Sequence, residues 1–318
     1  MPSSLDLLCV WGEGPAYRAT GLALPIVSRR GWILFASLGL IWGLPYLLIK
    51  VGVESLSVSM VIFSRMALGA LILLPIAIAT GQLKHLRGHW RWVIVFALVE
   101  LTFTLLALTW AEQRISSSLA GLFVAAVPIT TALIAWRLGL DDRLTGTRLV
   151  GMGVGIVGVG ALVGFDVSSD SILAVLALVV TVVGYSLGPI IIDRRLQGVP
   201  GVPVMAIAIG LNAVIYAPFA WLTRPTEPVP SSAWVAIALL GVLCTAIAFV
   251  IFFALVREVG PSRTTLITYV NPAVAVVLGI VILDEPFTLG IAIGFPLVLL
   301  GSWLATRRSP AIESEPHA

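Results

Sequence analysis

The sequence predicts an all-α integral membrane protein with ten transmembrane helices, built as two inverted repeats of five helices. Three observations support this prediction. Of the 318 residues, 59% are hydrophobic and only 11% are charged, whereas a typical soluble domain carries about 25% charged residues. The hydrophobic residues form long blocks, many of which have the length of a helix that crosses about 30 Å of hydrocarbon. Motifs from the first half of the chain also recur in the second half.

Ten hydrophobic blocks are the predicted spans. Short charged or Pro/Gly-rich connections separate them, as expected for helices that return directly through the bilayer. The blocks cover residues 32–51, 58–80, 92–111, 117–138, 147–164, 172–192, 203–222, 233–256, 264–283 and 288–306.

The spans divide the chain into two repeats with flanking segments. The first five spans form one repeat over residues 32–164, and the last five form the other over 172–306. Residues 1–31 are predicted to be an N-terminal cytoplasmic arm, and residues 165–171 an external linker. Residues 307–318 form a polar tail that we expect in the cytoplasm.

The distribution of lysine and arginine predicts the orientation, because cytoplasmic connections of membrane proteins carry an excess of both. With a cytoplasmic N-terminus, fifteen of these residues fall on the cytoplasmic side, and only Lys50, Arg114 and Arg224 fall outside. A missed helix would destroy this asymmetry. We therefore expect a multi-pass protein of the cell membrane with both termini in the cytoplasm.

One motif occurs twice and reveals the repeat. Both VPITTALIAWRLGLDDRLT (127–145) and NPAVAVVLGIVILDEPFT (271–288) have a proline near the start of a span. An acidic pair follows about thirteen residues later, Asp141–Asp142 in the first copy and Asp284–Glu285 in the second. Because each repeat has an odd number of helices, the second must cross the membrane upside down. Many secondary transporters build alternating access from such inverted repeats.

These motifs resemble the drug/metabolite transporter superfamily, specifically its ten-helix permeases made of two EamA-type halves. The similar segments are WGLPYLLIK and FSRMALGALILLP in the first two spans, and AAVPITTAL and VNPAVAVVLG in the fourth and ninth. The exits LDDRLT and LDEPFT are similar to the family's Leu-Gly-Glu-x-Leu-Thr, although Asp142 replaces the glutamate and an aspartate replaces the glycine in both. The resemblance covers about residues 32–306 and implies transport of small metabolites, commonly export.

The segment GMGVGIVGVG (151–160) contains the GxGxxG pattern of dinucleotide-binding turns. A dinucleotide site requires a strand before the glycines and an acidic residue about twenty positions after them. Here the glycines lie inside a hydrophobic span. We instead expect close helix packing through two small-xxx-small pairs, Gly151/Gly155 and Gly160/Gly164.

Two charged residues lie at membrane depth, Arg65 in the second span and Glu100 near the middle of the third. Each is a candidate site residue, because a charge inside a span costs about 2.5–3.5 kcal/mol on the translocon scale. One interpretation is a buried ion pair that ties the two helices together. The other is a cavity, where Arg65 attracts anionic groups and Glu100 receives a proton or a cationic group. If burial dominates, Glu100 could exchange protons near neutral pH and couple export to the proton gradient, whereas a nearby arginine would keep it ionised and prevent this exchange.

Aromatic and amide side chains form a second candidate set around a cavity near the bilayer midplane. A cavity lined by aromatic and amide side chains, with the charged groups of Arg65 and Glu100 nearby, suits an amino acid or a similar amphipathic solute. The alternative for tryptophan and tyrosine near span ends is an interfacial belt. The residues predicted to bind substrate are Trp42, Tyr46, Arg65, Glu100, Tyr185, Asn212, Tyr269 and Asn271.

The sequence contains no Ser/His/Asp, Cys/His or HExxH arrangement and no Walker loop, and its cysteines, Cys9 and Cys244, lie far apart. We therefore expect no enzymatic activity, no metal and no cofactor. The expected function is a secondary permease that exports amino acids or similar amphipathic solutes by alternating access. A non-transporting receptor or scaffold is the alternative. The expected partners are a small-molecule substrate and the lipid bilayer, not nucleic acid, while proton coupling and a homodimer stay open.

Overall fold

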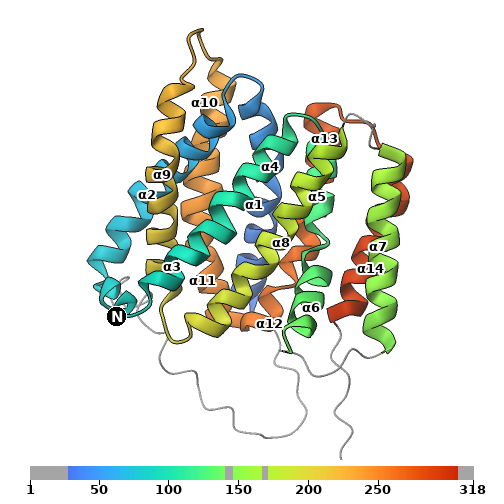
Figure 1. Cartoon of the computed structure of the whole chain (residues 1–318), viewed down its shortest axis with the longest axis horizontal. Coiled ribbons are helices and arrows are strands. Elements are labelled where there is room, and N and C mark those ends of the chain that lie inside the picture. Colours follow the sequence, from blue (N-terminus) through green and yellow to red (C-terminus); the bar gives the residue numbers. More distant parts are fainter. Residues whose placement is uncertain (1–27, 140–145, 167–170, 307–318) are drawn as a thin grey trace, which may run out of the picture.

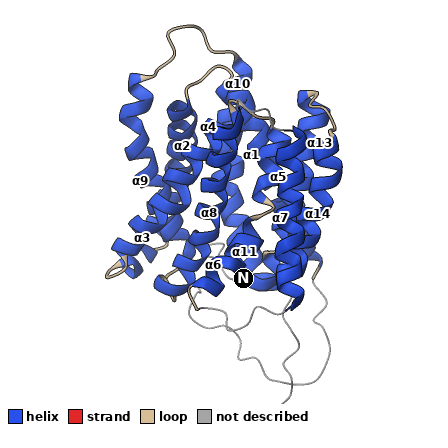
Figure 2. Cartoon of the chain, turned by 45° about the vertical axis from the view of Figure 1, so that its right-hand side comes forward, coloured by secondary structure: helices blue, strands red, loops and turns tan. Residues whose placement is uncertain are grey.

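The computed structural model describes residues 28–139, 146–166 and 171–306, and this part of the chain is helical without any strand (Figures 1 and 2). Nine of its helical spans are long and hydrophobic enough to cross a membrane, and one further hydrophobic helix, Ile267–Leu283, is shorter. The ten spans lie side by side as one bundle. The predicted all-α membrane fold is therefore confirmed.

The first half of the chain supplies five spans. Its first two spans are single helices, the third contains a central π-helical segment, and the fourth is made of two shorter helices. A short 3₁₀ helix, η2 (Gln82–Leu86), joins the second and third spans. The spans are α1 (Arg29–Val53), α2 (Val58–Ala79), α3 (Trp90–Phe96) with η3 (Ala97–Phe103) and α4 (Thr104–Glu112), α5 (Ser117–Val124) with α6 (Val127–Arg137), and α7 (Gly146–Asp166).

The second half repeats this plan. Its third span again contains a π-helical segment, and its fourth again has two parts. The spans are α8 (Ile172–Arg195), α9 (Gly201–Leu222), α10 (Ser231–Ala238) with η5 (Leu239–Ile247) and α11 (Ala248–Val259), α12 (Pro261–Thr264) with α13 (Ile267–Leu283), and α14 (Leu289–Thr306).

Local sequence explains where several helices begin. Ser28, Ser57 and Ser116 each accept a hydrogen bond at the side-chain oxygen from the backbone N–H three residues later. These serines satisfy N–H groups that have no partner within the first turn of α1, α2 and α5. The caps therefore fix the residues at which these three helices begin.

Matching helices of the two halves run in opposite directions. In Figure 1, α6 ends and α7 begins at the lower end of the bundle, whereas the connection from α13 to α14 (284–288) lies at the upper end. The first acidic exit, within 140–145, lies outside the described residues. Because α6–α7 and α13–α14 are equivalent pairs, the two repeats are inverted, as the odd number of helices requires. We use upper end and lower end below in the sense of Figure 1.

Packing between the halves follows the same symmetry. Spans with the same place in each half pack along one another, α2 against α9 and α7 against α14. The first span of each half also contacts the fourth span of the other, as α1 does with α13 and α8 with α6. The interface between the halves therefore runs through the centre of the bundle.

The glycine-rich α7 packs through only part of its glycine stripe. A Cβ on Gly151 or Gly158 would collide with the backbone of α14, and a Cβ on Gly155 would collide with Ile129. The pair Gly151/Gly155 therefore serves close packing as predicted. The prediction was wrong for Gly160/Gly164, which have no described atom within 4 Å of a Cβ position. The spacing of glycines in the sequence identifies a helix face without side chains. It does not show whether that face packs against another helix.

Candidate functional site

Arg65 projects from α2 toward the centre of the bundle. Its Nε donates a hydrogen bond to the Thr245 hydroxyl of η5 at 3.0 Å. Within the described residues, its two terminal nitrogens have no hydrogen-bond partner. Its positive charge interacts electrostatically with Tyr46 of α1, Tyr185 of α8 and Glu112 of α4. The guanidinium thus faces helices of both halves and retains donors that suit a carboxylate.

The π-helical segment η5 fixes the position of this guanidinium. Thr245 donates its hydroxyl to the Leu240 carbonyl, five residues earlier, at 2.7 Å. Its oxygen is then free to accept the hydrogen bond from Arg65. Gly69, one turn after Arg65, lets α2 approach this region, because a Cβ there would crowd the Thr245 methyl group. A π-segment at a functional site is a common use of this rare geometry.

Tyr46 and Tyr185 complete a central group. Tyr46 is 6% exposed, and its ring lies against Gly121 of α5. Tyr185 is half-buried on α8. Neither hydroxyl has a hydrogen-bond partner in the described part of the chain, and each lies within electrostatic range of the other and of Arg65. We call Tyr46, Arg65 and Tyr185 the central group.

Glu100 lies beside the central group and is not paired with Arg65. It belongs to η3 and packs its carboxylate against Gly188 of α8, where any Cβ would overlap it. Its Oε2 atom is buried without a hydrogen-bond partner. The described residues contain no ion pair between Glu100 and Arg65, yet both charges act on Tyr185. The Arg65 guanidinium and the Glu100 carboxyl group therefore both lie near Tyr185 without contacting each other.

Asn212 occupies a closed contact between α9 and η3. It is fully buried, and its amide oxygen accepts from the Thr102 hydroxyl at 2.7 Å. Its amide nitrogen donates to the carbonyls of Ala208 at 2.9 Å and Ala97 at 3.3 Å. Thr102 is the counterpart of Thr245, since it also donates to a carbonyl five residues earlier in a π-segment. The structure does not bring Asn212 into the central group.

Three other predicted site residues also lie outside the central group. Trp42 packs in an aromatic cluster with Phe249 and Phe252 of α11, with ring centroids 5.8 and 5.2 Å away. The Tyr269 hydroxyl hydrogen-bonds to Thr306 of α14 at 2.9 Å.

Asn271 joins α13 to α1. When the amide is oriented so that its nitrogen faces hydrogen-bond acceptors, this nitrogen donates to the carbonyls of Ile267 at 3.1 Å and Gly39 at 3.3 Å. This contact lies at the interface between the two halves. In this conformation Asn271 holds two helices together, so its amide is not directed to a free space.

A second cluster of charged groups, at the upper end, was missed by the sequence reading. Glu112 is fully buried, and neither carboxylate oxygen has a hydrogen-bond partner in the described structure. Lys50 donates its ammonium to the backbone carbonyls of Glu112 and Ile115, both at 2.8 Å. Glu112 ends its span next to Gln113 and Arg114, so the sequence suggests a solvated connection there.

Glu285 connects the two halves within this cluster. Its carboxylate accepts hydrogen bonds from the backbone N–H groups of Ser117 at 2.7 Å and Ser118 at 2.9 Å, and from the Ser118 hydroxyl. An anion is favourable at the N-terminus of a helix such as α5. We call Lys50, Glu112, Ser117, Ser118 and Glu285 the upper cluster. The repeated acidic exit was the one sequence signal that pointed to it.

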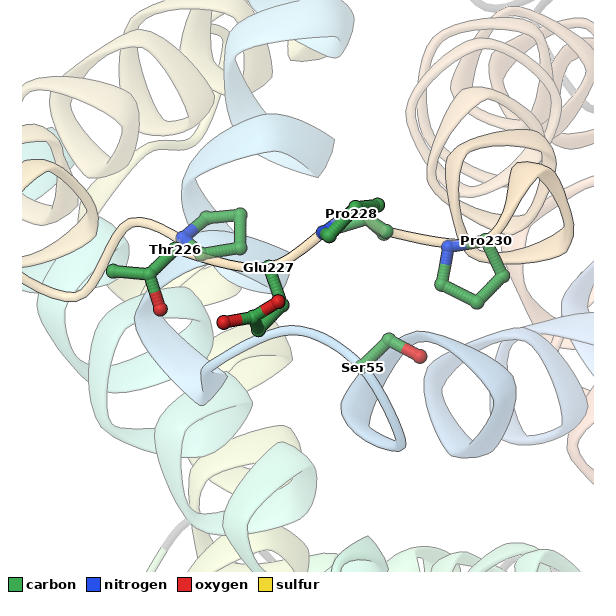
Figure 3. Close-up of a pocket in the computed structure, with 7 residues that line it drawn as sticks. Ser55, Thr226, Glu227, Pro228 and Pro230 are labelled. Carbon is green, nitrogen blue, oxygen red and sulfur yellow. The ribbon is translucent and has the colours of Figure 1, made fainter.

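A surface pocket also lies at the upper end, away from the central group. It has a volume of about 450 Å³ and is lined by Ser55 and residues 225–230. Figure 3 shows the proline-rich connection between α9 and α10 passing over the turn at Ser55. Glu227 is the single charged side chain in its lining. The described residues contain no group of three or more His, Cys, Asp or Glu that could hold a metal ion.

Comparison with known proteins gives a consistent family signal. The model of the EamA-like transporter family matches twice, over residues 29–164 and 172–307. The transporter YvbV of Bacillus subtilis (strain 168) is 24% identical over 293 residues, covering 89% of this chain and 94% of YvbV. The inner membrane transporter YedA of Escherichia coli (strain K12) is 28% identical over 251 residues, covering 77% of this chain and 80% of YedA.

Two further matches are a named exporter and a solved structure. A protein of Streptantibioticus cattleyicolor named "Probable terminal-alkyne amino-acid exporter" is 27% identical over 295 residues, covering 89% of this chain and 95% of that protein. A solved crystal structure aligns with a TM-score of 0.64 over 88% of this chain and 98% of the other, at 24% identity. The latter supports the fold alone.

Proposed function

The chain belongs to the EamA-like transporter family and is a multi-pass membrane transporter, and from this premise we propose that it is a secondary permease for amino acids or similar amphipathic solutes. We further propose that it exports them by alternating access. Two inverted repeats packed around a central interface support this mechanism, because rocking one repeat against the other exposes a fixed site to each side in turn.

The observation that carries the substrate class is the separation of Arg65 from Glu100. The terminal nitrogens of Arg65 have no described partner, and Glu100 Oε2 is buried without one. A guanidinium and a carboxyl group that lie near one tyrosine without contacting each other favour a zwitterion, because a single ligand then satisfies both. The guanidinium would hold the α-carboxylate, and the bound α-ammonium group would stabilise Glu100 as a carboxylate.

The rings of Tyr46 and Tyr185 supply the apolar part of this proposed site. Tyr46 lies against α5, and Tyr185 lies within electrostatic range of both Arg65 and Glu100. Such rings cover an apolar side chain while their hydroxyls contact polar groups. The relative named as an amino-acid exporter also favours this substrate class. Trp42, Asn212, Tyr269 and Asn271, which already contact other helices, are not in the proposed set.

Counterflow in proteoliposomes tests the proposal. Vesicles loaded with one unlabelled amino acid are diluted into labelled amino acid, and each of a panel is measured in this way. We expect at least one zwitterion to exchange, and its decarboxylated amine and its desamino acid to compete poorly. Empty-vesicle controls remove passive leakage.

Variants at the two charges make the test specific. Arg65→Gln removes charge-assisted hydrogen bonds worth about 1.5–3 kcal/mol, so the half-saturating concentration should rise roughly tenfold to hundredfold. Arg65→Lys keeps the charge and should recover part of this loss. Glu100→Gln should reduce the preference for the zwitterion over the desamino acid. A protein that exchanges no solute from a broad panel would favour the receptor or scaffold alternative.

A further inference from the structure

Glu112 is a buried carboxyl group that the proposed substrate site does not use. It is fully buried at the end of α4, and neither oxygen accepts a hydrogen bond from any described residue. A carboxylate in such a place loses its hydration without replacement, which is much more costly than burying the neutral acid. Glu285, only a short distance away in the same cluster, receives three donors from Ser117 and Ser118.

The charges around Glu112 oppose one another, since Lys50 and Arg65 favour the carboxylate and Glu285 disfavours it. The groups that act on it or on which it acts are Lys50 and Tyr46 of α1, Arg65 of α2, Tyr185 of α8 and Glu285. The described hydrogen bonds of the Lys50 ammonium go to backbone carbonyls and not to the Glu112 carboxyl oxygens. Neither cation donates a hydrogen bond to the Glu112 carboxyl oxygens in the described structure, so burial without hydration is what favours the neutral acid here.

The upper cluster also joins the two halves at this end of the bundle. Glu285 comes from the second half and holds the start of α5 in the first half, while Lys50 of α1 holds the end of α4. Separating the halves at this end would break the Glu285 contacts and let water reach Glu112. Hydrated glutamate is ionised near neutral pH.

We propose that Glu112 is a proton-binding site whose protonation is linked to closure of the upper end of the transporter. Closure transfers one proton from water to the Glu112 carboxylate, and opening returns it to water. Because the closed form binds one proton more than the open form, acid on this side favours closure. This inference rests on the alternating access proposed above, but it does not depend on the identity of the substrate.

Cys244 offers a reporter that needs no substrate. It is 1% exposed in η5, and its thiol lies within electrostatic range of Arg65 of the central group. In a Cys9→Ser background, an impermeant thiol reagent is added to the upper face of sealed membrane vesicles. Vesicles of both orientations are used, so that each face is tested. The rate of modification of Cys244 then reports how often the upper end opens.

The rate of Cys244 modification is measured from about pH 5 to pH 8.5 in the wild type and in Glu112→Gln. At each pH, the wild-type rate is divided by the rate of the variant. The division removes the pH dependence of the thiol itself. We expect the ratio to rise with pH by up to about tenfold per unit, the limit for one linked proton. Glu54→Gln, the control at an exposed carboxylate in the connection between α1 and α2, should keep the wild-type slope. Glu285→Gln should raise the rate at every pH but keep the slope.

A flat ratio would overturn the proposal, as would loss of the slope in Glu54→Gln with retention in Glu112→Gln. If Glu112→Gln does not fold, Glu112→Leu replaces it. Infrared spectroscopy of the wild type then provides a separate readout, the carbonyl band of a protonated carboxylic acid at neutral pH. That band should be present in the wild type and reduced in Glu112→Leu, and its absence from the wild type would exclude a protonated Glu112. None of these outcomes depends on amino-acid transport. Failure of the proton-binding proposal can therefore be distinguished from failure of the substrate proposal.

Discussion

Each charged side chain inside the bundle meets the cost of desolvation in a different way. Lys50 donates to two backbone carbonyls, and Glu285 accepts three hydrogen bonds at the start of α5. Arg65 has one described hydrogen bond, to Thr245, and Glu112 has none. An unpaired polar group is expensive in a buried place. The partly paired and unpaired groups are therefore the ones to which substrate and proton binding are assigned.

Thr245 should control affinity through Arg65. Thr245→Val removes the acceptor that orients the guanidinium, so we expect the half-saturating substrate concentration to rise about tenfold, as for a charged hydrogen bond of roughly 1.5 kcal/mol. Counterflow kinetics measure this effect. Thr102→Val is the matched control, because Thr102 has the same place in the other π-segment but contacts Asn212. An equal loss of affinity in both variants would contradict the role assigned to Thr245.

Asn212 should be important for stability and not for substrate affinity. Asn212→Ala leaves Thr102 and two backbone carbonyls without their partner, so the free energy of unfolding should fall by about 1–3 kcal/mol. Thermal unfolding in detergent measures this change, and counterflow per folded molecule should remain within about twofold of the wild type. Normal stability with abolished exchange would instead restore Asn212 to the substrate site predicted from sequence.

At the scale of elements, the hydrophobic pattern predicted the spans well. The block at 58–80 corresponds to α2 (Val58–Ala79), and the block at 172–192 lies within α8 (Ile172–Arg195). The π-segments η3 and η5 were not predicted, because their hydrogen bonds to the fifth residue depend on tertiary contacts and leave little mark on composition. The central group depends on η5, so this part of the site could not be placed from sequence.

The two glycine pairs of α7 provide a test of packing at this scale. Gly155→Leu places a large side chain against Ile129 and α14, where no space exists, and should destabilise the protein by about 1–3 kcal/mol or more. Gly160→Leu adds the same side chain on a face without a described neighbour and should be tolerated. Expression level and thermal unfolding compare the pair. Equal destabilisation would indicate that Gly160 also meets a partner, such as a second copy of the chain.

At the scale of the whole molecule, inversion was predictable because the repeat and the odd helix number require it. The upper cluster was not, because its members lie in four separate parts of the sequence, at residues 50, 112, 117–118 and 285. Arg65 and Glu100 were found because a charge inside a hydrophobic block is visible in the sequence. The separation of Arg65 from Glu100 was not visible in the sequence, because the rotation of each helix about its own axis determines that separation.

The last prediction at this scale concerns the orientation of the protein in the membrane, that is, which end of the bundle faces outward. Lys50, Arg114 and Arg224 are the cationic residues expected outside, and they belong to the upper end, whereas the connection with Lys84 and Arg87 belongs to the lower end. Positive charge is retained in the cytoplasm during insertion. The upper end should therefore face outward, and Glu112 should take its proton from the external medium.

Cysteine labelling in intact cells tests this orientation. Thr226, in the connection between α9 and α10, and His85, in η2, are both exposed and lie at opposite ends of the bundle. In a Cys9→Ser, Cys244→Ser background, Thr226→Cys should react with an impermeant maleimide in intact cells. His85→Cys should react only after the membrane is permeabilised, which also shows that the residue is reactive. The reverse pattern would place the upper end in the cytoplasm, and the proton that binds Glu112 would then come from the cytoplasm.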